Sequence, residues 1–333
     1  MTDKKCFLVT GGLGCIGAET TKWLLKNTTA NVVICGRDVR PARVARVFHD
    51  ITRTRLKVIA VDVANEQLIS DTIQNEGITH VIHLAALQTP DCNQHRDLGM
   101  QINLGGTQNL IEALKRHRSQ IERFVFASSI AVYGPRAFYP EGLVPVDAVP
   151  NPVNVYGAWK LAGENITRIF NEETGIDSIS LRPGVLFGPG RDAGLTSSPT
   201  TALKSVALGI PFEIPFCNRQ DYLYAPDVGA AFGHATLDHF TGYSAFTLPS
   251  HTVDTSRFVS SIKSASKTLG IKSQCSLRIG KQVVPFICDL AYDTFHSAFP
   301  NAPHTDLDAA VLASLRTFQQ QTERGWLSTD TIQ

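Results

Sequence analysis

Residues 7–17 read Phe7-Leu8-Val9-Thr10-Gly11-Gly12-Leu13-Gly14-Cys15-Ile16-Gly17, an apolar run that enters a glycine-rich turn. A helical pattern of apolar residues leaves the turn and continues to Leu25. In such a unit the first glycine permits a tight turn, the second lets backbone approach a pyrophosphate, and the third lets helix pack on strand. The helix directs its free N–H groups and positive dipole end at the phosphates. The stretch predicts a dinucleotide site made by Gly11, Gly14, Cys15, Ile16 and Gly17.

Outward from this turn, apolar strand-like runs alternate with helical patterns through the first half of the chain. Strands are expected at 6–10, 31–35, 56–61, 80–84, 123–127 and 178–182, and helices near 16–27, 39–50, 65–75, 97–117 and 154–173. Alternation of this kind, with near-continuous apolar strands, predicts an α/β fold in which helices cover both faces of a doubly wound parallel sheet. Ligands then bind beyond the carboxyl ends of the strands.

The alternation ends near Pro183, after which turn-forming residues interrupt the chain at 188–190, 196–200 and 211–215. A strand-like segment at 245–249 and helices near 254–268 and 306–322 follow. We therefore expect two parts. They are a dinucleotide-binding domain of residues 1–182 plus about 217–250, and a smaller C-terminal substrate domain of about 183–216 plus 251–333.

The composition is that of an ordinary globular protein, with 333 residues, 43% hydrophobic and 18% charged. A net charge of +1 provides no field for nucleic acid or an anionic membrane, so neither partner is expected. Seven cysteines without a CxxC pair predict reduced thiols in the cytoplasm, with no disulfide framework and no metal site. The N-terminal Met-Thr-Asp-Lys-Lys is followed by no long apolar stretch, so no signal peptide or membrane span is expected.

The end of the second strand bears on the choice of cofactor. An acidic residue there binds the adenosine ribose and favours NAD, but Gly36 and Arg37 occupy the place here. A guanidinium can pair with a 2′-phosphate, so NADP(H) is preferred, whereas Asp38 keeps NAD(H) possible and an exposed Arg37 without a ligand is the alternative. Asp62 and Val63 would lie beside the adenine, although Asp62 could equally be a turn cap.

Tyr156 and Lys160 lie one helical turn apart on a common face. A free phenol has a pKa near ~10, but a neighbouring lysine and an oxidised nicotinamide favour the phenolate. Ser128 and Ser129 follow the strand at 123–127, where a hydroxyl can hydrogen-bond the reacting oxygen. This pattern predicts proton transfer by Tyr156, coupled to hydride transfer with the cofactor.

Several ordered motifs give the chain a family resemblance that extends over essentially its whole length. It resembles the extended short-chain dehydrogenase/reductase superfamily, the NAD(P)-dependent epimerase/dehydratase group, whose cofactor domain is a Rossmann fold. The motifs are Thr10 to Gly17, His83-Leu84-Ala85-Ala86, Asn103-Leu104-Gly105-Gly106-Thr107, Phe126 to Gly134, Tyr156 to Lys160, Arg182-Pro183, Gly188-Pro189-Gly190 and Asp227-Val228.

The resemblance implies roles for individual residues. Tyr156 is the acid/base, Lys160 lowers its pKa and holds the nicotinamide ribose, and Ser129 is the substrate-oxygen partner, with Ser128 as the alternative. Further cofactor contacts would come from Leu84, Ala85, Ala86, Asn103, Pro183 and Val185. The helices near 97–117 and 154–173 resemble those that join two subunits of a homodimer through a four-helix bundle.

Two departures from the family pattern concern the substrate. Nucleotide-sugar members typically carry Asn where Val185 stands, and an Arg where Gln220 stands, with Arg219 one position away. A desolvated diphosphate needs cationic or multiple N–H partners, so these changes weaken a nucleotide-sugar substrate without excluding it. The substrate contacts expected from the remaining polar loop residues and the serine turn are Gln88, Ser129, Ile130 and Arg191.

Three functions follow from these residues. The first is an NAD(P)-dependent oxidoreductase acting on a hydroxyl or carbonyl of a sugar, sugar acid or related polar molecule. The second is a sugar or nucleotide-sugar epimerase with tightly bound NAD(P). The third, a non-catalytic NAD(P)-sensing protein, is disfavoured because Ser129, Tyr156 and Lys160 are all present.

Overall fold

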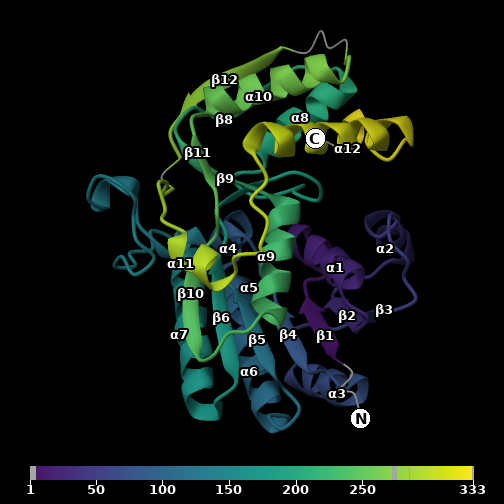
Figure 1. The fold of residues 1–333 in the computed structure, drawn as a ribbon, viewed down its shortest axis with the longest axis vertical. Helices are drawn as coiled ribbons and strands as arrows, with labels where there is room; N and C mark the ends of the chain where they lie inside the picture. Colours follow the sequence, from purple (N-terminus) through teal and green to yellow (C-terminus); the bar gives the residue numbers. More distant parts are fainter. Residues whose placement is uncertain (1–4, 272–275, 285, 332–333) are drawn as a thin grey trace.

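A computed structural model describes residues 5–271, 276–284 and 286–331, which include a seven-stranded parallel sheet (Figure 1). The strand order is β10-β6-β5-β4-β1-β2-β3, so β1 lies inside the sheet and the chain winds outward from it in both directions. The doubly wound prediction is therefore confirmed. The strands are β1 (Cys6–Thr10), β2 (Asn31–Gly36), β3 (Leu56–Ala60), β4 (His80–His83), β5 (Arg123–Ala127), β6 (Asp177–Arg182) and β10 (Tyr243–Thr247).

Each face of the sheet has its own hydrophobic core because successive side chains of a strand point to opposite sides. In β1, Phe7 and Val9 enter one core, whereas Leu8 enters the other. The first core is covered by α1 (Cys15–Asn27), α2 (Pro41–Val47), α9 (Ala225–Leu237) and α11 (Asp293–Ala298). The second is covered by α3 (Glu66–Glu76), α6 (Gly106–Arg116) and α7 (Val155–Thr174).

A second layer lies above the carboxyl ends of the central strands (Figure 1). It has a three-stranded sheet, β11-β9-β7, and a two-stranded sheet, β12-β8. Its third hydrophobic core holds Phe187, Tyr222 and Phe258 among fully buried side chains. The elements are β7 (Val185–Phe187), α8 (Ser198–Leu208), β8 (Phe212–Phe216), β9 (Gln220–Tyr224), β11 (His251–Val253), α10 (Thr255–Thr268), β12 (Leu277–Gln282) and α12 (Leu307–Glu323).

Helix α9 was absent from the sequence-based expectations, for a physical reason. It is apolar on most of its surface and buried, so it lacks the amphipathic period by which a surface helix is recognised. It packs closely on α1 through two glycines. A Cβ at Gly229 would lie 2.5 Å from the Cβ of Glu19, and one at Gly233 would lie 2.1 Å from the Trp23 ring.

Three other expectations are corrected. The helix expected at 97–117 is divided into α5 (Arg96–Met100), a π-helical turn at Gln101–Gly105 and α6. The strand expected at 245–249 is β10, which begins two residues earlier. Turn-forming residues predict an interruption at 211–215, but most of this segment belongs to strand β8, which pairs with β12.

The division into two parts stays a proposal, and the sheets suggest where its boundary lies. Strand β9 belongs to the outer three-stranded sheet, while β10 pairs with β6 in the central sheet. We therefore propose that the chain returns to the dinucleotide-binding part at Ala225, where α9 begins, and not at 217.

Candidate active site

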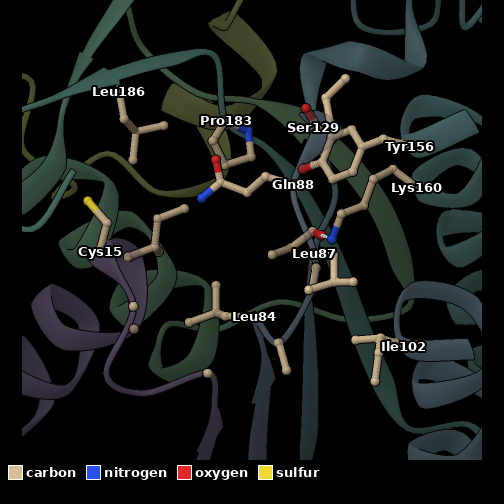
Figure 2. A pocket seen from close by; sticks show the side chains of 18 of the residues that line it. Cys15, Leu84, Leu87, Gln88, Ile102, Ser129, Tyr156, Lys160, Pro183 and Leu186 are labelled. Atoms are coloured by element: carbon tan, nitrogen blue, oxygen red, sulfur yellow. Dashed lines mark hydrogen bonds between the residues drawn. The ribbon is translucent and has the colours of Figure 1, made fainter. Parts of the chain in front are cut away.

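One elongated cavity of about 460 Å³ lies over the carboxyl ends of the central strands (Figure 2). It runs from the end of β2 past the glycine-rich turn to the start of α7. Nearly all residues expected at the site line it. They are Gly11, Gly14, Cys15, Ile16, Gly17, Arg37, Asp62, Val63, Leu84, Ala85, Ala86, Gln88, Ser129, Ile130, Tyr156, Lys160, Pro183, Val185 and Arg191.

The glycine-rich turn forms a close backbone cradle at the middle of the cavity. Gly11 has a φ of +66°, and a Cβ there would lie 3.0 Å from the Ala85 nitrogen. A Cβ on Gly17 would lie 2.4 Å from the Gly11 carbonyl oxygen, so the third glycine permits helix–turn contact. Gly14 is the N-cap of α1 and supplies no capping side chain, which leaves the first N–H groups for a ligand. This cradle fits a pyrophosphate.

The end of the cavity beside β2 is basic. Arg37 lines it, and so does Arg43 of α2, whose Nη2 donates to the Leu13 carbonyl at 3.2 Å. The Asp38 carboxylate accepts from Arg40 at 2.8 and 2.7 Å and from Arg43 at 3.2 Å. These bonds, first those to Arg40, lower the pKa of Asp38 to about 2. Arg43 was missed from the sequence because it belongs to no motif and reaches the cavity only through the fold.

Asp62 is a turn cap in the structure, and its contact with an adenine stays a prediction. It lines the cavity, and its Oδ1 also accepts from the Ala64 N–H at 2.9 Å as a turn cap. Val63 also lines the cavity.

The start of α7 brings the catalytic candidates together. Asn154 caps the helix by accepting from the Gly157 N–H at 2.9 Å, which puts Tyr156 in the first turn. A Cβ on Gly157 would lie 2.1 Å from the Ala131 carbonyl oxygen, so this helix end packs directly on the turn that follows β5. Figure 2 shows Ser129 and Tyr156 next to each other on one wall of the cavity. The Ser129 hydroxyl is near enough to lower the pKa of the Tyr156 phenol.

The charge around Tyr156 differs from the expectation in one respect. Burial raises the pKa of Tyr156, while the Ser129 hydroxyl and the positive charge of Arg191 partly offset that effect. The Lys160 ammonium, expected to lower this pKa, donates to the Ala127 carbonyl at 2.6 Å and lies 5.7 Å from the centre of the Tyr156 ring. Burial also lowers the pKa of Lys160 to about 8. Arg191 is therefore a cation that acts on the phenol in this structure.

The two serines after β5 have different surroundings. Ser128 is buried, and its hydroxyl donates to the Glu164 carboxylate. Ser129 accepts from the Ala131 N–H at 3.1 Å and faces the cavity. The hydroxyl of Ser129, and not that of Ser128, is available to a ligand.

Asn103 is the one expected cofactor residue that does not line the cavity. It is buried, and its side chain accepts from the Leu87 N–H at 2.7 Å and donates to the Leu87 carbonyl at 2.9 Å. Asn103 therefore holds the loop after β4 in place, and its side chain does not line the cavity where a ligand would bind. His83 is also buried in the core, between Thr10 at 2.8 Å and Thr107 at 3.2 Å.

The substrate end of the cavity contains Gln88 and Arg191, and Figure 2 shows Gln88 pointing inward. Thr196 accepts from Arg191 at 3.3 Å, and Leu195 and Phe286, which were not recognised from the sequence, also line the cavity. They come from irregular segments without a motif, so only the folded chain brings them to the site.

Arg219 and Gln220 do not line the cavity. Arg219 donates to Asp289 at 2.5 Å, and Gln220 is fully buried at the start of β9. Val185 does line it, with an apolar side chain where related nucleotide-sugar enzymes typically carry an amide. Within residues 5–271, 276–284 and 286–331, no group of three or more His, Cys, Asp or Glu could hold a metal ion. Likewise, no described helix is long and apolar enough to span a membrane.

The fold and this cavity define a dinucleotide-dependent enzyme class, and comparison with known proteins gives the family. The model of the NAD dependent epimerase/dehydratase family matches residues 7–244, and the chain belongs to this family. Its resemblance to the extended short-chain dehydrogenase/reductases is thereby confirmed.

Characterised relatives include both dehydrogenases and epimerases. The chain is 28% identical to a D-erythronate dehydrogenase of Cupriavidus necator over 211 residues, which are 61% of this chain and 60% of that protein. It is 34% identical to a UDP-glucose 4-epimerase of Schizosaccharomyces pombe, over 61% of this chain and 56% of that protein. The matches thus span less than two thirds of these relatives.

Solved structures resemble the fold over nearly the whole chain. A UDP-glucose 4-epimerase of Thermus thermophilus in complex with NAD has a TM-score of 0.78 at 22% identity, covering 94% of this chain and 99% of that one. An L-threonine dehydrogenase of Clostridium difficile also has a TM-score of 0.78, at 19% identity, covering 98% and 99%. At these identities the likeness concerns the fold alone.

Proposed function

We propose that this protein is an oxidoreductase that uses NADP(H) to interconvert a hydroxyl and a carbonyl of a sugar, sugar acid or related polar molecule. One observation carries the proposal. Ser129, Tyr156 and Lys160 line the same cavity as the glycine cradle, so a proton-transfer group and a dinucleotide site share one space. The sequence similarity to a D-erythronate dehydrogenase supports the dehydrogenase form of this proposal.

The cavity residues fit a nicotinamide dinucleotide. The cradle of Gly11, Gly14 and Gly17 would hold its pyrophosphate, and Arg37 and Arg43 would hold a 2′-phosphate at the basic end. NADP(H) is preferred because Asp38, the acid that could bind a free ribose, is already bonded to Arg40 and Arg43. NAD(H) is the alternative. When bound, the cofactor supplies the hydride acceptor or donor.

The chain's own residues then orient the substrate oxygen and move its proton. Ser129 would donate to the reacting oxygen and hold it beside the Tyr156 hydroxyl. In the oxidation direction the Tyr156 oxygen takes the hydroxyl proton, and in reduction it returns a proton to the carbonyl oxygen. Lys160, fixed by the Ala127 carbonyl, adds positive charge beside the Tyr156 ring at 5.7 Å.

An epimerase is the second candidate, and the similarity to a UDP-glucose 4-epimerase favours it. Two observations weigh against it. Val185 offers no polar contact, and Arg219 is bonded to Asp289 outside the cavity, so neither position supplies a partner for a diphosphate. A sensing protein without catalysis is disfavoured because Ser129, Tyr156 and Lys160 are all present and line one cavity.

The assembly and location are also proposals. Leu98, Met100 and Ile169 expose apolar side chains on the helices expected to form a four-helix bundle, which supports a homodimer. Free thiols at Cys15, Cys35, Cys92, Cys217 and Cys288 support a reducing cytoplasm, whereas Cys275 lies outside the described residues.

The deciding experiment measures both nicotinamide cofactors with free sugars, sugar acids and nucleotide sugars. We expect net production or consumption of NADPH with a free polar compound, followed by its absorbance. A purified protein that retains stoichiometric cofactor through dialysis and interconverts a sugar nucleotide without net absorbance change would establish the epimerase instead.

A further inference from the structure

Arg191 is a cavity-lining cation without a carboxylate partner. It forms no ion pair with any residue in the described part of the chain, and its guanidinium contacts neutral oxygens. Nη1 donates to Gln88 Oε1 at 3.2 Å and Nη2 to Thr196 Oγ1 at 3.3 Å. The buried Nε has no partner among the described residues. The Arg191 guanidinium is therefore held only by long hydrogen bonds to neutral groups, and a ligand can replace those hydrogen bonds.

The local chain is shaped to hold this guanidinium. Gly188 and Gly190, with φ values of +113° and +80°, form the turn that precedes Arg191. Gly194 has a φ of +108°, and a Cβ there would lie 2.0 Å from Gln88 Oε1 and 2.8 Å from Arg191 Nη2. The positive φ favours glycine here, and the missing side chain leaves room for the ends of Gln88 and Arg191, which are bonded to each other.

The position of Arg191 relates it to the reacting group. Its charge lowers the pKa of Tyr156 at the catalytic wall and that of Cys15 in the glycine turn, in both cases against the larger effect of burial. Its guanidinium thus lies within electrostatic reach of the phenol. A molecule that contacts Tyr156 through its reacting group can therefore contact Arg191 through a second group.

The surroundings favour a single negative charge. Arg219 is bonded to Asp289, and Lys204 donates to Asp192 at 2.5 Å, and neither lines the cavity. A diphosphate would place two charges against one available guanidinium, whereas a carboxylate matches its fork with two parallel hydrogen bonds. Leu195 and Phe286 add apolar surface to the cavity lining, which suits a short carbon chain.

We infer that Arg191 and Gln88 form a carboxylate receptor, and that the substrate is a small hydroxy acid or the corresponding oxo acid. This inference rests on the proposed function. In oxidation the hydroxyl proton passes to the Tyr156 oxygen, the hydride leaves the same carbon for oxidised NADP, and the C–O bond becomes C=O. The carboxylate is unchanged and only anchors the molecule.

The test compares aldonic acids of three to six carbons with the sugar alcohols of the same lengths. For the wild type we expect kcat/KM for at least one acid to exceed that for its matched alcohol by about 100-fold or more. Arg191→Gln should lower that preference at least tenfold, mainly through the KM for the acid, and Arg191→Lys should recover part of it. Arg219→Gln is the matched control, because its guanidinium is bonded outside the cavity, and it should keep the preference.

Two binding measurements separate this inference from the proposed function. The Kd for NADPH should change less than threefold in Arg191→Gln, and a large loss would assign Arg191 to a cofactor phosphate and overturn the inference. Calorimetry of the acids with NADP⁺ present should show binding that Arg191→Gln removes. Equal turnover of acids and alcohols would overturn the receptor while leaving the oxidoreductase. Arg191-dependent acid binding without any hydride transfer would contradict the oxidoreductase while leaving the receptor.

Discussion

Arg182 donates to both carboxylate oxygens of Glu164 at 2.7 Å, and the two side chains are 7% and 5% exposed. The pair lies beneath the catalytic wall, because Glu164 also accepts from Ser128 and Arg182 also donates to the Tyr133 hydroxyl at 2.6 Å. It joins α7, β6 and the turn after β5, which are the elements that position Tyr156 and Ser129.

Glu164→Gln should therefore destabilise the protein strongly. The substitution leaves the Arg182 guanidinium buried without a counter-charge, and breaking such a pair typically costs about 3–5 kcal/mol. Urea unfolding followed by circular dichroism measures the loss. Glu172→Gln is the control, since its pair with Arg168 is exposed and should contribute less than about 0.5 kcal/mol. Equal losses for the two variants would mean that burial does not set the strength of the Glu164 pair.

Tyr156→Phe should reduce turnover by about 100-fold to 10,000-fold, the usual contribution of a general acid/base. The phenol oxygen is lost while the ring that packs near Lys160 is kept, so the Kd for NADPH should stay within a few-fold of the wild type. Steady-state kinetics and fluorescence titration measure the two quantities. Turnover that is unchanged in the variant would remove Tyr156 from the mechanism.

Arg37→Ala should weaken NADPH binding by about 10-fold to 100-fold and NADH binding far less. The expected loss is one charge-assisted contact with the 2′-phosphate, which NADH lacks. Titration of both reduced cofactors measures the ratio of the two Kd values. Arg46→Ala is a suitable comparison because Arg46 is an exposed residue of α2 that does not line the cavity. Equal losses for NADPH and NADH in Arg37→Ala would show that Arg37 does not contact the 2′-phosphate.

The parts of the site that the sequence predicted are those carried by local patterns. The glycine turn, the serine turn after β5 and the Tyr156–Lys160 pair each lie within one short motif, and the fold brings them to one cavity. Arg43 and Phe286 could not be found in this way, because they reach the cavity from α2 and from a segment after β12. A sequence motif also does not predict the direction in which a side chain points. Asn103 matches the family pattern, yet it bonds the Leu87 backbone behind the cavity.

The strands of the central sheet were predicted because each is a short apolar run between turn signals. Helix α9 was missed because tight packing on α1 through Gly233 requires a nearly uniform apolar surface. A helix is recognised in a sequence by the contrast between its apolar and polar faces, and this buried helix has little such contrast.

His83 should make the protein more sensitive to acid. Burial lowers its pKa from 6.5 to about 3, so the unfolded chain binds a proton there between these values while the folded chain does not. The free energy of unfolding should therefore fall as pH decreases from 6.5 towards 3, by up to about 1.4 kcal/mol per pH unit from this group.

His83→Gln, which does not titrate, should lose stability less steeply over the same range, even if it is less stable at neutral pH. His239→Gln, an exposed control, should keep the wild-type slope. Urea unfolding between pH 4.5 and 7, at roughly half-unit steps, measures the slopes. If His83→Gln and the wild type have the same slope, the imidazole takes up its proton without unfolding, and the buried Thr10–His83–Thr107 arrangement accommodates the charge.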